Sequence, residues 1–140
     1  MAKMYPPQIS ELTKSPGEIE LFIKLKNDLV SDEWVVFHSL DIANHKTQRF
    51  GEIDFVILVP GKGGICVEVK AIKSIQYENG FWFLGQKSKE KRGPFKQVRD
   101  GMHSLQEYIW AKNPSLKHIP FTSVVYFPYV EFDSQSPEWN

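Results

Sequence analysis

Four ionisable side chains stand within two sequence runs that are otherwise typical of buried β-strands. The segment 51–71 reads GEIDFVILVPGKGGICVEVKA, and its two runs contain Glu52, Asp54, Glu68 and Lys70. Ionised groups are costly inside a protein unless they are paired or bind a metal ion. Their retention in these runs therefore indicates a functional cluster.

Side chains alternate between the two faces of a strand. In the first run, one face carries Ile53, Phe55, Ile57 and Val59, and the other carries Glu52 and Asp54. In the second run, one face carries Ile65, Val67 and Val69, and the other carries Cys66, Glu68 and Lys70. The short PGKGG turn makes the two runs antiparallel neighbours, so we expect Asp54, Glu68 and Lys70 to converge on one patch.

Two neighbouring carboxylates repel each other, and a cation relieves that repulsion. Hard oxygen ligands suit Mg²⁺ or Mn²⁺, which lowers the pKa of bound water and stabilises charge on a phosphoryl group. A lysine on the same face orients water or neutralises the transition state. The alternative is an exposed hairpin face with a cross-strand Glu–Lys pair, although the strongly apolar flanking residues argue against exposure.

Sequence patterns along the chain predict the helices and strands that position this hairpin. Ser15, Pro16 and Glu18 form a capping-box pattern that predicts a helix start, and apolar residues follow at helical spacing. Strands are predicted at 34–40, 52–59, 64–71 and 121–127, a helix at 94–110, and a hairpin at 74–85 that turns at Asn79-Gly80. This order predicts an α/β domain with a central mixed sheet.

Composition limits the class of protein. The chain has 140 residues, zero formal net charge and one cysteine, Cys66, which predicts one domain in a reducing, cytoplasmic compartment with no membrane partner. We expect an N-terminal arm at 1–13, the folded domain at 14–128, and a polar tail at 129–140 that leads into a further domain of a longer chain.

Basic residues are concentrated between the hairpin and the later helix. They are Lys87, Lys89, Lys91, Arg92, Lys96 and Arg99, against one acid, Glu90. Such a cluster can follow a nucleic-acid backbone. The alternative is an ordinary solvated loop, and charge alone does not decide between the two.

Three stretches together resemble a known family. SPGE at the first helix, EIDFVILVPGKGGICVEVKA across the charged hairpin, and GPFKQV at the later helix resemble the nuclease-related domain, NERD, of the PD-(D/E)XK nuclease superfamily. The resemblance spans about residues 14–128. It implies a restriction-endonuclease-like core of α-β-β-β-α-β order, here with an inserted hairpin.

The resemblance also implies site residues. Asp54 and Glu68 would be metal ligands with the Val69 carbonyl as a third, and Lys70 would be the catalytic lysine. Glu18 matches an acid of the first helix that helps to hold a second metal, and Gln97 matches a glutamine near the site. The sequence departs from the superfamily pattern in two places: Ile53 replaces a proline, and the additional acid Glu52 is an alternative ligand to Glu18.

Several of these residues have structural alternatives. A capping box accounts for Glu18, although its helical stripe directs it toward the sheet, and an exposed helical position accounts for Gln97. His38, within a strand, is expected to be a hydrogen-bonded structural residue. Cys66 has no obvious histidine partner, so a nucleophilic role is not expected.

The sequence thus supports two hypotheses. The first is a metal-dependent nuclease domain that hydrolyses DNA phosphodiester bonds through water activated by Mg²⁺ or Mn²⁺. The second is a nucleic-acid-binding accessory domain that has the nuclease fold and little catalysis of its own. The acid–acid–lysine set favours the first hypothesis, and the neutral net charge favours the second. Both hypotheses are compatible with a homodimer.

Overall fold

The computed structural model describes residues 1–13, 15–28, 32–41, 52–85, 90–91 and 93–131, with only the backbone described for residues 40, 41 and 52. The chain forms, in order, β1 (Lys3–Tyr5), α1 (Pro16–Asn27), β2 (Val35–Asp41), β3 (Glu52–Val59), β4 (Gly63–Val69), β5 (Ile75–Glu78), β6 (Phe81–Leu84), α2 (Gly93–Lys112), the 3₁₀ helix η1 (Pro114–His118) and β7 (Phe121–Tyr126). Among the described residues, no helix is both long and apolar enough to cross a membrane.

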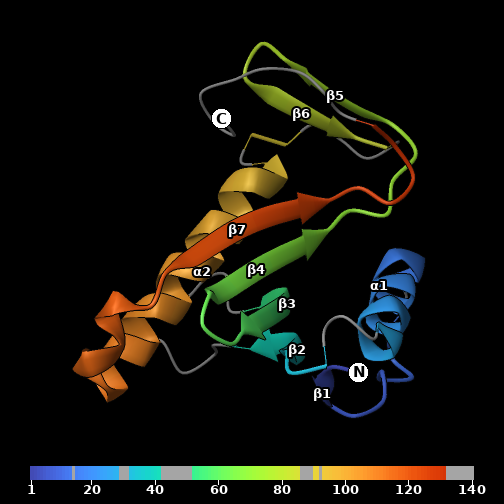
Figure 1. Ribbon diagram of the computed structural model, residues 1–140. Coiled ribbons are helices and arrows are strands. Elements are labelled where there is room, and N and C mark those ends of the chain that lie inside the picture. Colours follow the sequence, from blue (N-terminus) through green and yellow to red (C-terminus); the bar gives the residue numbers. More distant parts are fainter. Residues whose placement is uncertain (14, 29–31, 42–51, 86–89, 92, 132–140) are drawn as a thin grey trace.

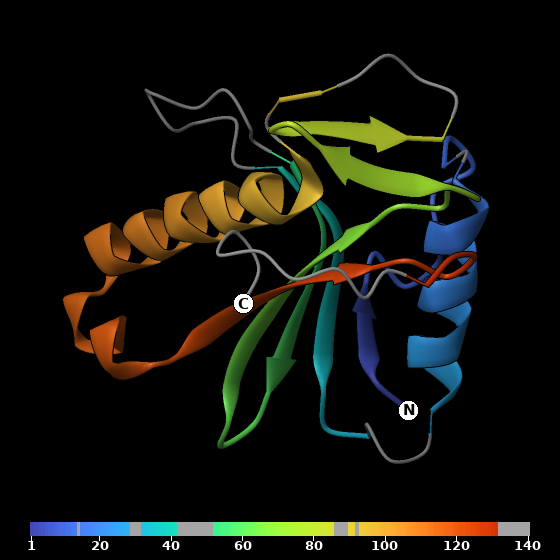
Figure 2. The ribbon, with the colours of Figure 1, turned by 90° about the horizontal axis from the view of Figure 1, so that it is seen from above.

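Five strands form one mixed sheet in the order β1-β2-β3-β4-β7 (Figure 1). The β2–β3 and β3–β4 pairs are antiparallel, whereas β1–β2 and β4–β7 are parallel. Figure 2 shows this sheet between the two helices. The predicted α/β class with a central mixed sheet is therefore confirmed.

Each face of the sheet has its own hydrophobic core. On one face, Phe22 and Leu25 of α1 pack with side chains of the sheet that include Phe55 and Val67. On the other face, Val98, Met102 and Leu105 of α2 pack with Ile53, Val56 and Cys66. Burial of apolar surface on both faces fixes the sheet between the helices.

The strand alternation expected for β3 is correct except at Ile53. Phe55 and Ile57 lie in the α1-side core, whereas Ile53 lies in the α2-side core. Pairing of β2 with β3 runs through His38↔Phe55 and resumes at Leu40↔Ile53. Between these pairs Ser39 adopts φ 56°, which is outside the strand region. The distortion accompanies the change of face at the start of β3, just beside Asp54.

The first residues were expected to form a loose arm, and that expectation is wrong for β1. Lys3–Tyr5 pairs with Val35–Phe37 of β2, and Ala2 and Met4 are buried at 8% and 6% exposure. A three-residue strand carries too few residues to show an alternating pattern. Its place depends on the apolar surface and hydrogen-bonding groups that β2 provides.

The β5–β6 hairpin forms a separate two-stranded sheet. The hairpin turns at Asn79-Gly80 as expected, and these residues have φ of 53° and 81°, the positive values that a type I′ turn requires at both central positions. Trp82 of β6 is fully buried, and its ring lies 5.7 Å from that of Phe95 in α2. The hairpin therefore packs against the start of α2 through the ring of Trp82.

Candidate active site

Asp54 and Glu68 meet where β3 begins and β4 ends. The backbone N–H of Val69 donates to Asp54 Oδ2 over 2.9 Å, so the Asp54 side chain is fixed against β4 at the residue that follows Glu68. Backbone pairing between the two strands ends at Phe55↔Val67. Asp54 therefore continues the contact between β3 and β4 with its side chain.

Glu68 is a buried carboxylic acid, with 5% of its surface exposed. Burial, and secondarily repulsion by Asp54, raises the pKa of Glu68 from 4.5 to about 7, against the opposing influence of Lys70. Desolvation and a like charge both disfavour the ionised form. A perturbed carboxyl beside a second carboxyl is typical of a functional site.

Lys70 completes the cluster that the alternation predicted. Its Nζ lies 3.3 Å from Glu68 Oε1, and its side chain is 23% exposed. Its backbone N–H donates to the carbonyl of Tyr126 over 3.0 Å, which continues the β4–β7 pairing past Val69. The ammonium is thus held at the end of β4, between the buried acid and solvent.

The start of α1 lies against this end of β4. A Cβ added at Gly17 would stand 2.9 Å from Ala71 Cβ and 3.0 Å from Val69 Cγ1, so the approach depends on a residue without a side chain. Ser15 caps the helix by accepting from the Glu18 N–H at 3.4 Å. The helix is thereby fixed with Glu18 directed toward the sheet.

Glu18 contacts His38 of β2, as 3.1 Å separates Glu18 Oε1 from His38 Nε2. His38 is buried at 5% exposure, and its ring lies 4.7 Å from that of Phe55. The expectation of a hydrogen-bonded structural histidine is met. Glu18 was not predicted from the sequence as the partner of His38. The available signal was a polar residue, His38, within an apolar strand, together with an acid on the stripe of the first helix that faces the sheet.

The other expected site residues are either described by their burial or lie outside the described residues. Gln97 is half-buried on α2, Lys91 and Lys96 are exposed, and Arg99 is half-buried. Lys87, Lys89 and Arg92 lie outside the described residues, and only the backbone of Glu52 is described. Cys66 is buried, and burial raises the pKa of its thiol to about 12, so a nucleophilic role does not fit.

The donor chemistry of the cluster fits a hard divalent cation in part. Asp54 and Glu68 supply two carboxylates, and their repulsion is of the kind that a cation relieves. Among the residues whose side chains are described, however, no group of three or more His, Cys, Asp or Glu could hold a metal ion. A full ligand set would therefore draw on backbone oxygen, water, substrate or a side chain outside those described, such as that of Glu52.

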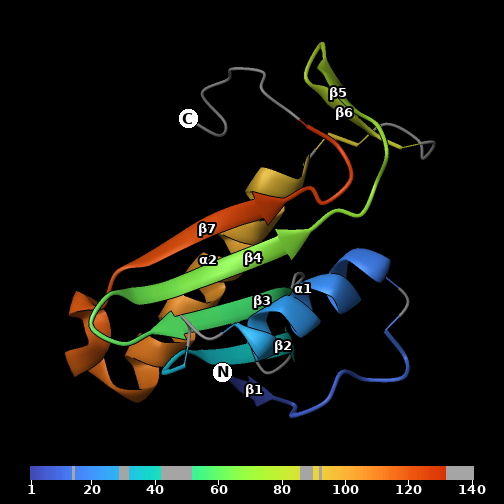
Figure 3. The ribbon, with the colours of Figure 1, turned by 45° about the vertical axis from the view of Figure 1, so that its right-hand side comes forward.

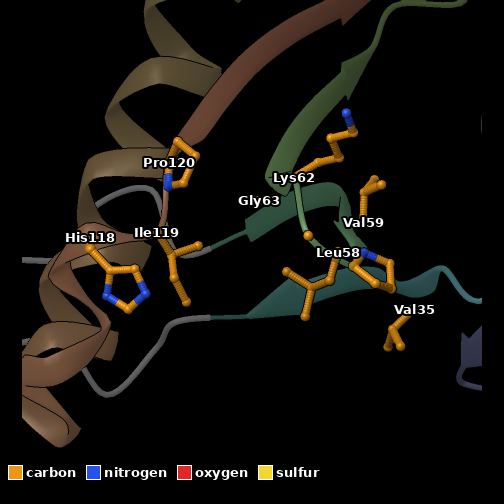
Figure 4. Close-up of a pocket in the computed structure, with 10 residues that line it drawn as sticks. Val35, Leu58, Val59, Lys62, Gly63, His118, Ile119 and Pro120 are labelled. Atoms are coloured by element: carbon orange, nitrogen blue, oxygen red, sulfur yellow. The ribbon is translucent and has the colours of Figure 1, made fainter.

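One pocket lies at the opposite end of the β3–β4 hairpin. Its volume is about 480 Å³, and its lining includes Leu58, Val59, Lys62, His118 and Pro120 (Figure 4). It surrounds the turn that joins the two strands, whereas Asp54 and Glu68 lie at the far ends of those strands. The pocket is thus separate from the carboxylate cluster.

The comparison with protein families decides the classification. The nuclease-related domain, NERD, matches residues 13–128. The chain belongs to the NERD family. No curated protein and no solved structure matches it. Membership of NERD implies a nuclease-related function for the domain and indicates an interaction with nucleic acid.

Proposed function

We propose that this NERD domain hydrolyses phosphodiester bonds of DNA at the Asp54–Glu68–Lys70 cluster. The observation that carries the proposal is the ammonium of Lys70 3.3 Å from the carboxylate of Glu68, next to an Asp54 that is fixed by Val69. Two acids and a lysine at one strand end are suited to phosphoryl chemistry, where negative charge must be held and neutralised.

In this reaction a water oxygen attacks phosphorus, the bond from phosphorus to the leaving oxygen breaks, and the water loses a proton. Lys70 is the residue suited to orient that water and to balance charge on the phosphoryl oxygens. Asp54 and Glu68, with the Val69 carbonyl, would hold Mg²⁺ or Mn²⁺. When bound, such an ion supplies Lewis acidity and lowers the pKa of water.

The remaining residues would support this centre. Glu18 would extend the acidic group from the start of α1, with His38 as its positioning partner at 3.1 Å, and Glu52 is the alternative ligand. Gln97 would contact the DNA backbone. The basic group would bind phosphates and consists of Lys87, Lys89, Lys91, Arg92, Lys96 and Arg99.

A nucleic-acid-binding accessory domain is the second candidate. One observation favours it: Lys70 already pairs with Glu68 within the protein, so the buried acid has a counter-charge without a metal ion. In that case the fold would be retained for binding, and the cluster would stabilise the end of β4.

Cleavage and binding assays on one set of variants separate the two candidates. Wild type, Glu68→Gln, Asp54→Asn and the exposed control Glu11→Gln would be incubated with a DNA duplex in Mg²⁺ or Mn²⁺. The nuclease proposal expects cleavage by wild type and the control, and none by the two site variants. DNA binding by all four proteins without cleavage by any would support the accessory domain and overturn the nuclease.

A further inference from the structure

β7 ends the sheet with an open main-chain edge. It is the last strand in the order β1-β2-β3-β4-β7, and in the described part of the chain no strand pairs with its outer side (Figure 3). Its sequence, FTSVVY, contains no charge, glycine or proline. An uncharged strand of high β-propensity with unpaired backbone groups is a template for another strand.

The opposite edge of the sheet is protected in the ways that natural proteins use. β1 has only three residues, one of which is Lys3, and Pro6 and Pro7 follow it without backbone N–H donors. Short length, charge and proline all discourage the addition of a strand. The contrast makes β7 the edge that is open to pairing.

The hydrogen bonds between β4 and the residues of β7 and its flanks show which backbone groups of β7 point outward. The carbonyls of Pro120 and Tyr126 both accept from β4, from the N–H groups of Gly64 and Lys70, each over 3.0 Å. Successive residues of a strand direct their N–H and C=O groups to opposite edges. The outward groups therefore belong to Phe121, Ser123 and Val125.

We infer that β7 pairs antiparallel with β7 of a second copy of this chain, about a twofold axis at Ser123. The Ser123 N–H of each copy donates to the Ser123 carbonyl of the other copy. Phe121 of each copy pairs in the same way with Val125 of the other. About six main-chain hydrogen bonds form. The two sheets become one continuous sheet, and the α2 helices lie on the same side of it.

Self-pairing fits this strand for two reasons. Its outward backbone groups are symmetric about Ser123, as an isologous interface requires. The strand has no charged residue, so self-pairing places no like charges opposite each other. Thr122 and Val124 are both exposed, Val124 to 45%, and the twofold makes them cross-strand neighbours. The inference is independent of the proposed nuclease activity.

A matched pair of variants at Ser123 tests the hydrogen bonding. Sedimentation velocity over micromolar to submillimolar concentrations should give a dimer for wild type and for Ser123→Ala. Ser123→Pro removes an outward N–H, and its dimer dissociation constant should rise at least about tenfold. A monomeric wild type, or a folded Ser123→Pro that dimerises like wild type, would overturn the inference.

A disulfide cross-link tests the register directly and does not depend on the proline variant folding. Thr122→Cys combined with Val124→Cys places the two thiols opposite each other between copies in a non-hydrogen-bonded pair, which suits disulfide geometry. Oxidation should yield a covalent dimer that reductant cleaves, whereas Thr122→Cys alone should yield no covalent dimer. The native Cys66 is buried and does not compete. Absence of the cross-link in the double variant would overturn the register.

Discussion

The ammonium of Lys70 lies 3.3 Å from Glu68 Oε1, at the point where β4 ends. One residue of the pair is almost wholly buried and the other is partly exposed. Burial and Asp54 raise the pKa of Glu68 to about 7 although this cation is adjacent. The site thus contains an electrostatic conflict that Lys70 only partly resolves, and removal of either partner has measurable consequences.

Glu68→Gln should stabilise the metal-free protein at pH 8 while it abolishes cleavage. In the folded protein the pKa of Glu68 is about 7, above the ordinary 4.5, so the folded state retains a proton that the unfolded chain releases. Wild-type stability is therefore full below pH 4.5 and falls as pH rises toward 7, by about 3 kcal/mol in total.

Urea unfolding in chelator at pH 4.5, 6 and 8 measures this difference, with the exposed Glu11→Gln as control. The advantage of Glu68→Gln over wild type should grow across that interval and then level off. A difference that is constant with pH would show that Glu68 is not held in its protonated form by the fold.

Lys70→Ala should lower cleavage by about 10²-fold, the effect of removing one donor that stabilises transition-state charge. Calorimetric titration of Mn²⁺ should still show binding, because the lysine is no ligand, whereas Glu68→Ala should abolish it. The exposed Lys73→Ala is the matched control and should match wild type in both assays. Full activity of Lys70→Ala would remove the lysine from the proposed centre.

The Glu18–His38 contact should couple α1 to β2 energetically. His38→Leu leaves a half-buried carboxylate without this partner and should cost about 1–3 kcal/mol of unfolding free energy. With Glu18→Gln and the double variant, a thermodynamic cycle should give a coupling of about 0.5–3 kcal/mol. Costs that add within about 0.3 kcal/mol would mean that the contact contributes nothing of its own.

Two glycines with nearly the same φ should respond differently to alanine. Gly61 and Gly93 have φ of 74° and 75°, but a Cβ at Gly61 meets nothing within 4 Å, whereas one at Gly93 stands 2.1 Å from Trp82 Nε1. Gly61→Ala should cost about 1 kcal/mol for the left-handed conformation. Gly93→Ala adds a steric conflict and should cost about 3 kcal/mol or more. Equal losses on urea unfolding would contradict a close fit of the hairpin on α2.

The sequence by itself determined the local elements and the central cluster. Ser15 and Pro16 set the start of α1, and Asn79-Gly80 set the β5–β6 turn. Strand alternation placed Glu68 and Lys70 on the same face at the end of β4, where they are in contact. These features depend on neighbours a few residues apart, where capping, turn conformation and the two-residue period of a strand act directly.

Only the tertiary structure decided the contacts between distant segments. β1 joins the sheet because β2 offers it a hydrogen-bonding edge, and Ile53 changes face where Ser39 interrupts the β2–β3 pairing. Glu18 meets His38 twenty positions along the chain because Gly17 lets α1 approach β4 closely. Such contacts depend on how apolar faces pack in three dimensions, and no short-range pattern encodes that packing.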